Sequence, residues 1–302
     1  MATAIEIGQL NKWYYTNRLR RVPIVENLSL EVNTGEIFGF LGANGAGKTT
    51  TIKMIMGLSR PSSGTITLLG LPAQEPLARK QVGFLPEHPQ FPRNLTAFEF
   101  MKLSASLSTG TSSDLDSLLE KVGLKDARHK KIETFSKGMQ QRLGIAQALI
   151  GNPHLLIFDE PMSGLDPIGR NDVSNLIMDL AREGRTVFFS THILSDAQLL
   201  CDRIAFLKKG KLLKVYGKHG FEQDEPSRTL HVTGISQDSI QRLKEKFPIE
   251  FQHSAADTWR IDVPNNPVFW AVMDMVRQEN GYLLSTSINV KALQKYWGHS
   301  ME

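Results

Sequence analysis

The sequence has little cysteine and no long apolar segment. Its 302 residues include a single cysteine, Cys201, which can form no internal disulfide and has no second thiol for a metal site. No apolar run approaches the roughly 18 residues that a membrane-spanning helix needs. Residues 1–10 carry no basic cluster ahead of an apolar core, so they do not resemble a secretory signal. These absences predict a cytoplasmic protein.

A strong excess of one charge is also missing. The net charge is +4, and with 41% hydrophobic and 22% charged residues the composition excludes a disordered chain, collagen and a coiled coil. Residues 221–302 hold 8 basic against 11 acidic residues, a net −3, which leaves +7 on residues 1–220. A basic surface suits nucleoside phosphates, anionic lipid or nucleic acid, and charge alone does not choose among them.

The first 218 residues predict an α/β fold around a parallel sheet. A buried strand at 36–41 leads through a glycine-rich turn into a helix at about 48–58. Segments 24–32 and 64–69 alternate more and carry turn residues, so we expect an antiparallel β flank. Three further apolar runs lie at 155–158, 186–189 and 204–207. Each is next to a segment with a helical pattern in the sequence, which is the layout of a parallel sheet with crossover helices.

A mostly helical insertion, at about 87–150, is expected between the first and second central strands. Within it, apolar residues follow the capping candidate Ser113 at the spacing of an amphipathic helix. These residues are Leu115, Leu118, Leu119 and Val122.

A domain boundary is predicted near 216–227, which gives domains at 1–218 and 225–302. Glycine, proline and charge changes interrupt every periodic pattern there. The second domain reads as strand, helix, two strands, helix and strand, followed by a short helix at 291–297. This is the ferredoxin-like order, so we expect a small α+β domain. The expected elements lie at 229–232, 237–247, 249–262, 267–278 and 283–288.

The glycine-rich turn matches the phosphate-loop pattern G-x-x-x-x-G-K-[ST]. The matching residues are Gly42, Ala43, Asn44, Gly45, Ala46, Gly47, Lys48 and Thr49. In a loop between a strand and a helix, backbone N–H groups and the helix N-terminus surround phosphate oxygens. Lys48 is expected to reach the β- and γ-phosphates and Thr49 to bind Mg²⁺. Thr50 belongs to the same expected nucleotide-binding set.

Two adjacent carboxylates, Asp159 and Glu160, follow the buried run at 155–158. Side chains alternate along a strand, so one carboxylate can face a metal ion and the other an attacking water. We therefore predict Asp159 as a metal ligand and Glu160 as the general base. A solvated acidic turn is the alternative, but the carboxyl end of a core strand is the ligand edge of an α/β sheet.

A third feature is Ser136, followed by Gly138 and a helical pattern. Ser136 would cap that helix, and its hydroxyl with the first-turn N–H groups can form a second anion site. Taken alone, this motif is more often a plain helix cap than an anion site.

Together these motifs resemble the ATP-binding subunit of ATP-binding cassette (ABC) transporters, over about residues 4–218. The phosphate loop, the Asp-Glu strand end and the Ser-x-Gly motif occur in the family's order. In this resemblance residues 136–140 look like the signature motif and residues 163–166, which include Asp166, like the D-loop. His192 looks like the switch histidine that contacts the γ-phosphate. Tyr14 falls where the family stacks an aromatic ring on adenine, with a buried strand aromatic as the alternative.

The sequence departs from the family pattern at two motifs. The usual signature Leu-Ser-Gly-Gly-Gln has Lys137 and Met139 at its third and fifth positions, although Ser136 and Gly138 keep their places. Glu87 replaces the Q-loop glutamine, and its carboxylate can still bind Mg²⁺ or orient water. Both variants look like the ABC-2 branch of mostly exporters, whose small appended domain the C-terminal segment also resembles.

The resemblance implies an ATPase subunit that binds and hydrolyses MgATP to drive transport, in the direction of export, through separate membrane subunits. It also implies a dimer with an identical or different ATP-binding subunit, in which ATP lies between one phosphate loop and the other chain's signature serine. The insertion after Glu87 would dock on the membrane subunit, so the protein would lie at the cytoplasmic face of the cell membrane.

Two other functions use similar residues. A soluble ABC ATPase acting on ribosomes or nucleic acid would use the +7 of residues 1–220 as a binding surface. Such proteins usually fuse two cassettes or carry long coiled coils, and this sequence has neither, so no nucleic-acid partner is expected. A small-molecule kinase or GTPase would leave Ser136, residues 163–166 and His192 unexplained together.

Overall fold

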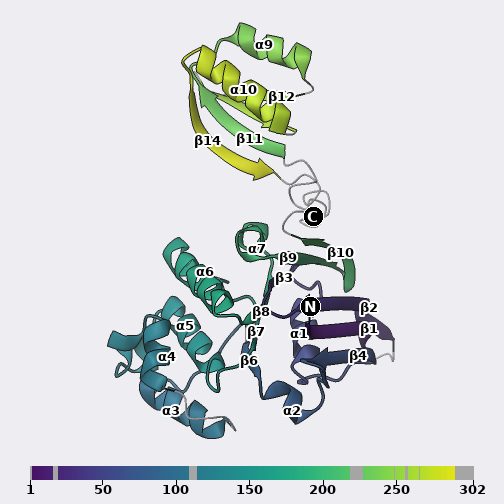
Figure 1. The fold of residues 1–302 in the computed structure, drawn as a ribbon, viewed down its shortest axis with the longest axis vertical. Coiled ribbons are helices and arrows are strands. Elements are labelled where there is room, and N and C mark those ends of the chain that lie inside the picture. Colours follow the sequence, from purple (N-terminus) through teal and green to yellow (C-terminus); the bar gives the residue numbers. More distant parts are fainter. Residues whose placement is uncertain are drawn as a thin grey trace. The chain divides into compact units, whose positions relative to one another are not determined.

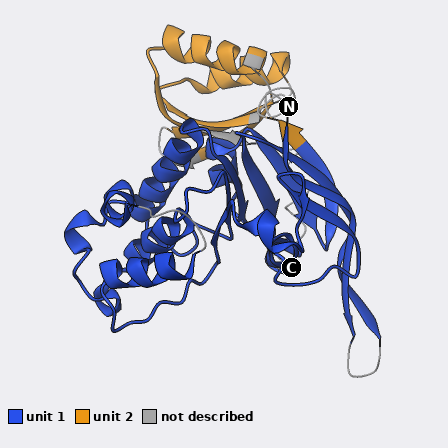
Figure 2. Cartoon of the chain, turned by 60° about the horizontal axis from the view of Figure 1, so that its bottom comes forward, with its two compact units in different colours: residues 1–215 blue, residues 216–302 orange. Residues whose placement is uncertain are grey.

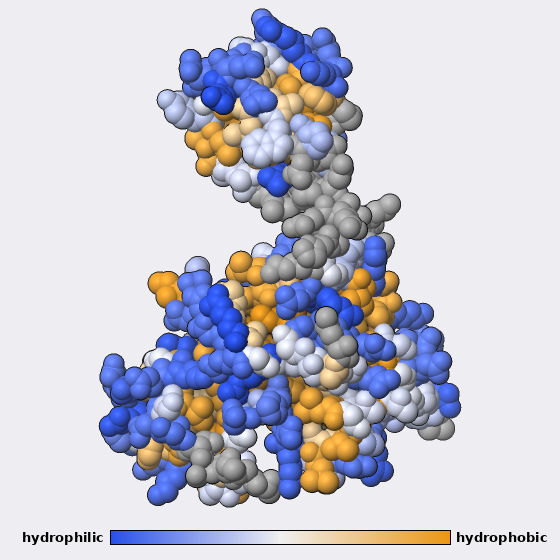
Figure 3. Space-filling view, in the orientation of Figure 1, coloured by the Kyte–Doolittle hydropathy of each residue, from blue (hydrophilic) through white to orange (hydrophobic). Residues whose placement is uncertain are grey.

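The computed structural model describes residues 2–15, 20–108, 114–217, 227–247, 249–255, 258–264 and 266–289. Contacts divide the chain into two compact units, Met1–Val215 and Tyr216–Glu302, coloured separately in Figure 2. Each unit has an apolar core of its own. Figure 3 shows hydrophobic residues as separate patches among hydrophilic ones on the drawn face. Within the described ranges no helix is both long and apolar enough to cross a bilayer.

A six-stranded sheet forms the centre of the first unit (Figure 1). Its order is β10 (Lys211–Gly217), β9 (Arg203–Lys208), β3 (Ile37–Gly42), β8 (Thr186–Thr191), β7 (Leu155–Phe158) and β6 (Val82–Leu85). The pairs from β9 to β6 are parallel. The four predicted central strands are confirmed, but β6 and β10 were not predicted. Because β6 precedes the helical segment, the insertion lies between β6 and β7 rather than directly after the first central strand.

Large side chains fill both faces of this sheet. Phe38 and Phe188 stack across the β3–β8 pair with ring centroids 5.9 Å apart, and both are fully buried. Every residue of β3, β7 and β8 is buried, which explains why these strands are continuous apolar runs. Cys201 is also buried, as a small apolar residue would be.

An antiparallel sheet flanks the central one, as predicted. Its order is β2 (Arg21–Asn33), β1 (Thr3–Tyr15), β4 (Ser63–Leu68) and β5 (Leu71–Pro72). The prediction lacked β1, which lies between the two expected strands: Ile5 pairs with Val32 on one side and with Leu68 on the other.

Helices connect the central strands. Helix α1 (Lys48–Ile55) ends three residues before the predicted limit, because Gly57 takes a positive φ of 66° at the following turn. Asp166 caps helix α6 (Pro167–Arg182) through a bond from the Gly169 N–H, and Pro167 occupies its first position. Helix α7 (Leu194–Leu200) is short, as is α2 (Pro76–Arg79).

The insertion contains α3 (Ala97–Leu107), α4 (Leu115–Lys121), two 3₁₀ turns (Lys125–Ala127 and Ile132–Thr134) and α5 (Lys137–Ala148). A capping box between Thr96 and Glu99 begins α3. The predicted cap Ser113 lies outside the described residues, and Asp114 caps α4 through the Ser117 N–H. The amphipathic pattern of α4 is confirmed, since Leu119 is fully buried.

The second unit is a four-stranded antiparallel sheet with two helices. Its elements are β11 (Ser227–Thr233), α9 (Gln237–Lys246), β12 (Glu250–Ala255), β13 (Thr258–Val263), α10 (Asn266–Gln278) and β14 (Tyr282–Asn289). The sheet order β12-β13-β11-β14 and the β-α-β-β-α-β sequence are ferredoxin-like. The helix predicted at 291–297 lies outside the described residues.

Candidate functional site

The phosphate loop joins the end of β3 to the start of α1. Gly47, the N-cap, has a φ of 104°, and a Cβ there would lie 2.8 Å from the Ile24 carbonyl oxygen, so only glycine fits. Asn44 and Gly45 are exposed. The N–H groups of the first turn of α1 have no intrahelical acceptor, so the loop can surround an anion.

Lys48 is buried and turns back onto the loop that precedes it. Its Nζ donates to the carbonyl oxygens of Gly42, at 2.6 Å, and Ala43, at 3.3 Å. The same Nζ lies 3.1 Å from Glu160 Oε1. The side chains of Lys48 and Glu160 are 5% and 7% exposed, so this is a buried ion pair, and removing one partner would leave an unpaired buried charge that destabilises the protein.

Asp159 is held at the end of β7 by hydroxyl groups. Ser190 Oγ donates to Asp159 Oδ1 at 2.6 Å and accepts from the Glu160 N–H at 2.9 Å. Burial raises the pKa of Asp159, and hydrogen bonds from Ser190 and Thr49 partly oppose this rise. Asp159 and Thr49 therefore place a carboxylate and a hydroxyl together beside the phosphate loop.

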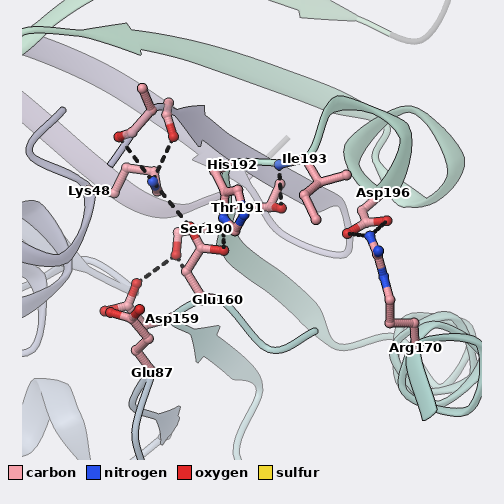
Figure 4. Close-up of polar contacts among 12 residues, drawn as sticks. Lys48, Glu87, Asp159, Glu160, Arg170, Ser190, Thr191, His192, Ile193 and Asp196 are labelled. Atoms are coloured by element: carbon pink, nitrogen blue, oxygen red, sulfur yellow. Dashed lines mark hydrogen bonds and ion pairs between the residues drawn. The ribbon is translucent and has the colours of Figure 1, made fainter. Parts of the chain in front are cut away.

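Glu160 lies between two basic side chains (Figure 4). One carboxylate oxygen contacts Lys48, and the other lies 2.9 Å from His192 Nδ1. The Glu160 backbone has a φ of 50°, in the left-handed region that residues other than glycine rarely adopt. Such backbone strain is common at functional sites. Strand β7 ends at Phe158, so this left-handed turn, and not the alternation of side chains along a strand, sets the direction of Glu160.

Glu87 joins the site from β6. This strand pairs with β7, and the Asp159 N–H bonds to the Leu85 carbonyl, so both carboxylates leave the same sheet edge. Figure 4 shows Glu87 beside Asp159, and its negative charge adds to the rise in the Asp159 pKa. Even so, no three acidic, histidine or cysteine side chains in the described ranges are grouped closely enough to hold a metal ion.

The signature residues form a different pocket, of about 380 Å³, between the start of α5 and the start of α6. Ser136 Oγ caps α5 by accepting from the Met139 N–H at 3.2 Å. A Cβ on Gly164 would collide with the Lys137 side chain, so the lysine lies against the loop at 163–166. The pocket is lined by Ser136, Lys137, Gly138, Arg142, Gly164, Leu165, Asp166, Ile168, Gly169 and Asp172. This lining includes no phosphate-loop residue, Glu160 or His192.

Tyr14 lies on β1 with its side chain open to solvent. It is 51% exposed, and Lys12 Nζ lies 5.0 Å from the ring centroid. Arg21 lies over the neighbouring rings of Trp13 and Tyr15, although Tyr15 is itself 57% exposed. The alternative of a buried strand aromatic is therefore wrong for Tyr14, and stacking on adenine stays a prediction.

Two contacts near the carboxyl ends of the central strands were not predicted from the sequence. Ser190 joins Asp159 and Glu160, and Arg170 pairs with Asp196. Ser190 lies near the end of β8, two residues before the candidate His192, and this position could have indicated it. No local pattern indicates the pairing of Arg170 with a residue 26 positions away.

Comparisons with known proteins agree with this geometry. A family profile described as "ABC transporter" matches residues 25–163. The chain is 37% identical over 303 residues to an uncharacterised ABC transporter ATP-binding protein of Nostoc sp., covering 98% of this chain and 89% of that protein. It is 42% identical over 219 residues to the bacitracin transport ATP-binding protein of Bacillus licheniformis, covering 71% and 70%. A solved dimeric ATP-binding cassette in a post-hydrolysis state, bound to ADP and Pi, has the same fold: TM-score 0.64, 24% identity, 71% and 98% covered.

Proposed function

We infer the function of this chain from the family to which it belongs, that of the ABC transporter ATP-binding proteins. The chain is an ATP-binding subunit and an ATPase of this family. The roles of its residues, its metal ion, its partners and its location are our proposals. The observation that carries them is the position of Glu160, held between Lys48 and His192 at the edge where the phosphate loop begins.

The phosphate loop holds the phosphates of ATP, and Tyr14 stacks on the adenine. Backbone N–H groups of residues 42–50 surround the phosphate oxygens. When ATP binds, Lys48 leaves the carbonyl oxygen of Gly42 and contacts the β- and γ-phosphate oxygens. Its ammonium group then no longer pairs with the Glu160 carboxylate. Binding of nucleotide therefore frees the carboxylate oxygen that Lys48 contacts at 3.1 Å.

Thr49 and Asp159 suit a magnesium ion, with Glu87 close by. Their hydroxyl and carboxylate oxygens are hard ligands, and the burial that raises the Asp159 pKa favours a cation beside it. Because the described residues form no complete cage, phosphate and water must supply the remaining ligands, which is usual for Mg²⁺. A Mg²⁺ ion held by these residues would neutralise charge on the phosphates.

Hydrolysis then requires a base and a group at the γ-phosphate. Glu160 accepts a proton from water as the water oxygen bonds to the γ-phosphorus and the bond to the ADP oxygen breaks. His192, 2.9 Å from Glu160 Oε2, holds that carboxylate and reaches the γ-phosphate.

A second ATP-binding subunit completes the site. Ser136, Gly138 and Asp166 line a pocket separate from the phosphate loop, so a second chain can bring its own pocket onto the bound ATP. The solved dimeric cassette supports this arrangement. The partner can be identical or a different cassette.

The site drives transport through separate membrane subunits, in the direction of export. The name of the bacitracin relative supports a transport role. Exposed leucines on α3, Leu103 and Leu107, offer apolar surface within the insertion to a membrane subunit. Binding to such a subunit would place this chain at the cytoplasmic face of the membrane. A polytopic membrane protein encoded beside this chain would support this assignment, and a ribosomal or nucleic-acid partner would contradict it.

The dimer is tested with Glu160→Gln, which should keep ATP bound by blocking its hydrolysis. We expect light scattering to show a dimer with MgATP and a monomer with MgADP. Adding Ser136→Arg should prevent the dimer without affecting nucleotide binding to the chain's own phosphate loop. A monomer with saturating MgATP would contradict a homodimer and favour a different cassette as partner.

A further inference from the structure

Arg170 and Asp196 form an ion pair between α6 and α7, at the right of Figure 4. Arg170 Nη2 donates to both carboxylate oxygens of Asp196, at 2.7 and 2.8 Å. The Asp196 side chain is only 13% exposed and that of Arg170 is 32% exposed. A charge-assisted contact in such a place is stronger than a surface ion pair.

Arg170 belongs to the element that begins with the loop at 163–166. Its N–H bonds to the Asp166 carbonyl oxygen at 2.9 Å, in the first turn of α6. Asp166 lines the pocket that contains Ser136, and the loop starts three residues after Glu160. A shift of the loop is therefore a shift of the start of α6 and of Arg170.

Asp196 belongs to the element that begins with His192. It lies in the first turn of α7, a seven-residue helix with no side-chain cap at its N-terminus. So short a helix is marginal by itself and depends on tertiary contacts. The Arg170 guanidinium supplies such a contact one turn after His192.

These contacts close a ring. Glu160 is joined to His192 by the 2.9 Å contact, and His192 continues to Asp196 along the chain. Asp196 is joined to Arg170, from which the chain returns through residues 163–166 to Glu160. We propose that Arg170 and Asp196 are positioning residues for hydrolysis, which hold His192 against Glu160 and couple it to the loop at 163–166. This inference rests on the proposed roles of Glu160 and His192.

Removing the pair should lower kcat rather than raise KM. The reason is that neither residue takes part in the contacts described above for the phosphate loop and Tyr14, which are proposed to bind ATP. Arg170→Met should lower kcat about threefold to thirtyfold, the range for a coupling residue that touches no ligand. Asp196→Asn should act similarly, and the charge that it leaves unpaired, that of Arg170, is the more exposed of the two, so this variant remains informative if Arg170→Met folds poorly. Arg170→Lys should retain most activity, because one nitrogen makes both bonds in the native pair.

The matched control is Arg182→Met. Arg182 is on the same helix and pairs with Asp179 at 2.9 Å, but the two side chains are 74% and 62% exposed. Its removal should leave kcat and KM unchanged, because exposed pairs contribute little.

The deciding experiment is a double-mutant cycle in the full chain with His192→Ala, measuring MgATP hydrolysis. If Arg170 acts through His192, Arg170→Met should cost nothing further in the His192→Ala background. The proposal would be overturned if Arg170→Met lowered kcat by the same factor in the wild-type and His192→Ala backgrounds. An Arg170→Met variant with wild-type kcat would also overturn it. Hydrogen–deuterium exchange of residues 191–200 gives a readout without turnover: exchange should quicken in Arg170→Met and not in Arg182→Met. Unchanged exchange would also overturn it, whereas a wild-type chain that hydrolyses no MgATP would count against the proposed function alone.

Discussion

The contact of Lys48 with Glu160 gives a prediction with two measurable parts. Lys48→Met keeps the aliphatic stem and removes the ammonium, which is bonded to Gly42 O and lies 3.1 Å from Glu160. Losing one charged hydrogen bond to phosphate costs ~1.5–3 kcal/mol. Affinity for MgATP should therefore fall about 10- to 150-fold.

The same change should destabilise the protein without nucleotide. The Glu160 side chain is 7% exposed, and removing one partner of a buried ion pair costs ~3–5 kcal/mol. His192 still contacts the other carboxylate oxygen, so we expect the lower end of that range. Adding Glu160→Gln should restore part of the loss, because it removes the unpaired charge.

Calorimetry measures the affinity and urea unfolding measures the stability. Lys53→Met is the control, since Lys53 is an exposed lysine on the same helix and should change neither quantity. Unchanged MgATP affinity in Lys48→Met would refute the phosphate role of Lys48. Unchanged stability would refute the energetic importance of its contact with Glu160.

Three further changes test other parts of the site. Asp159→Asn should weaken Mg²⁺-dependent ATP binding yet raise the free energy of unfolding near pH 7, because burial raises the Asp159 pKa and so penalises its charged form. That gain in stability should shrink as the pH falls through the raised pKa, because Asp159 is then protonated in the folded protein. Urea titrations at several pH values measure it, and a gain that is absent or does not change with pH would contradict this prediction. Tyr14→Ala should weaken ATP binding by ~1–3 kcal/mol if the ring stacks on adenine, whereas Tyr15→Ala should not; equal affinities by calorimetry would remove Tyr14 from the site. Deleting residues 225–302 should leave MgATP affinity unchanged, and loss of binding by a folded truncated chain would mean that the second unit contributes to the site.

Much of the central sheet could be predicted because its strands are buried on both faces. The run at 155–158 is wholly apolar, and the run at 186–189 is apolar after its first residue, a threonine. Both therefore differ clearly from the sequence around them. Strand β6 is short and includes Gly83 and two half-buried residues, so it carries no such signal. Strand β1 was missed because its bulged, partly exposed pattern follows no clear alternation.

The candidate site divides in the same way between local and distant contacts. Lys48, Asp159 and Glu160 lie in short motifs next to strand ends, so the sequence places them at one sheet edge. The contact of Lys48 with Glu160 joins residues far apart in the chain and depends on the order of β3, β8 and β7. The Ser190 bridge and the Arg170–Asp196 pair likewise depend on tertiary structure, which a single sequence does not reveal.

The central claim is that Glu160 is the base for ATP hydrolysis, and the rate of phosphate release by Glu160→Gln tests it most directly. The substitution keeps the shape of the side chain and removes its ability to accept a proton. At saturating MgATP we expect turnover about 100- to 10,000-fold below wild type, with MgATP still bound. Glu120→Gln, at an exposed glutamate on α4, should turn over like wild type. A Glu160→Gln rate within a few-fold of wild type would contradict the claim and assign the base to His192 or Glu87.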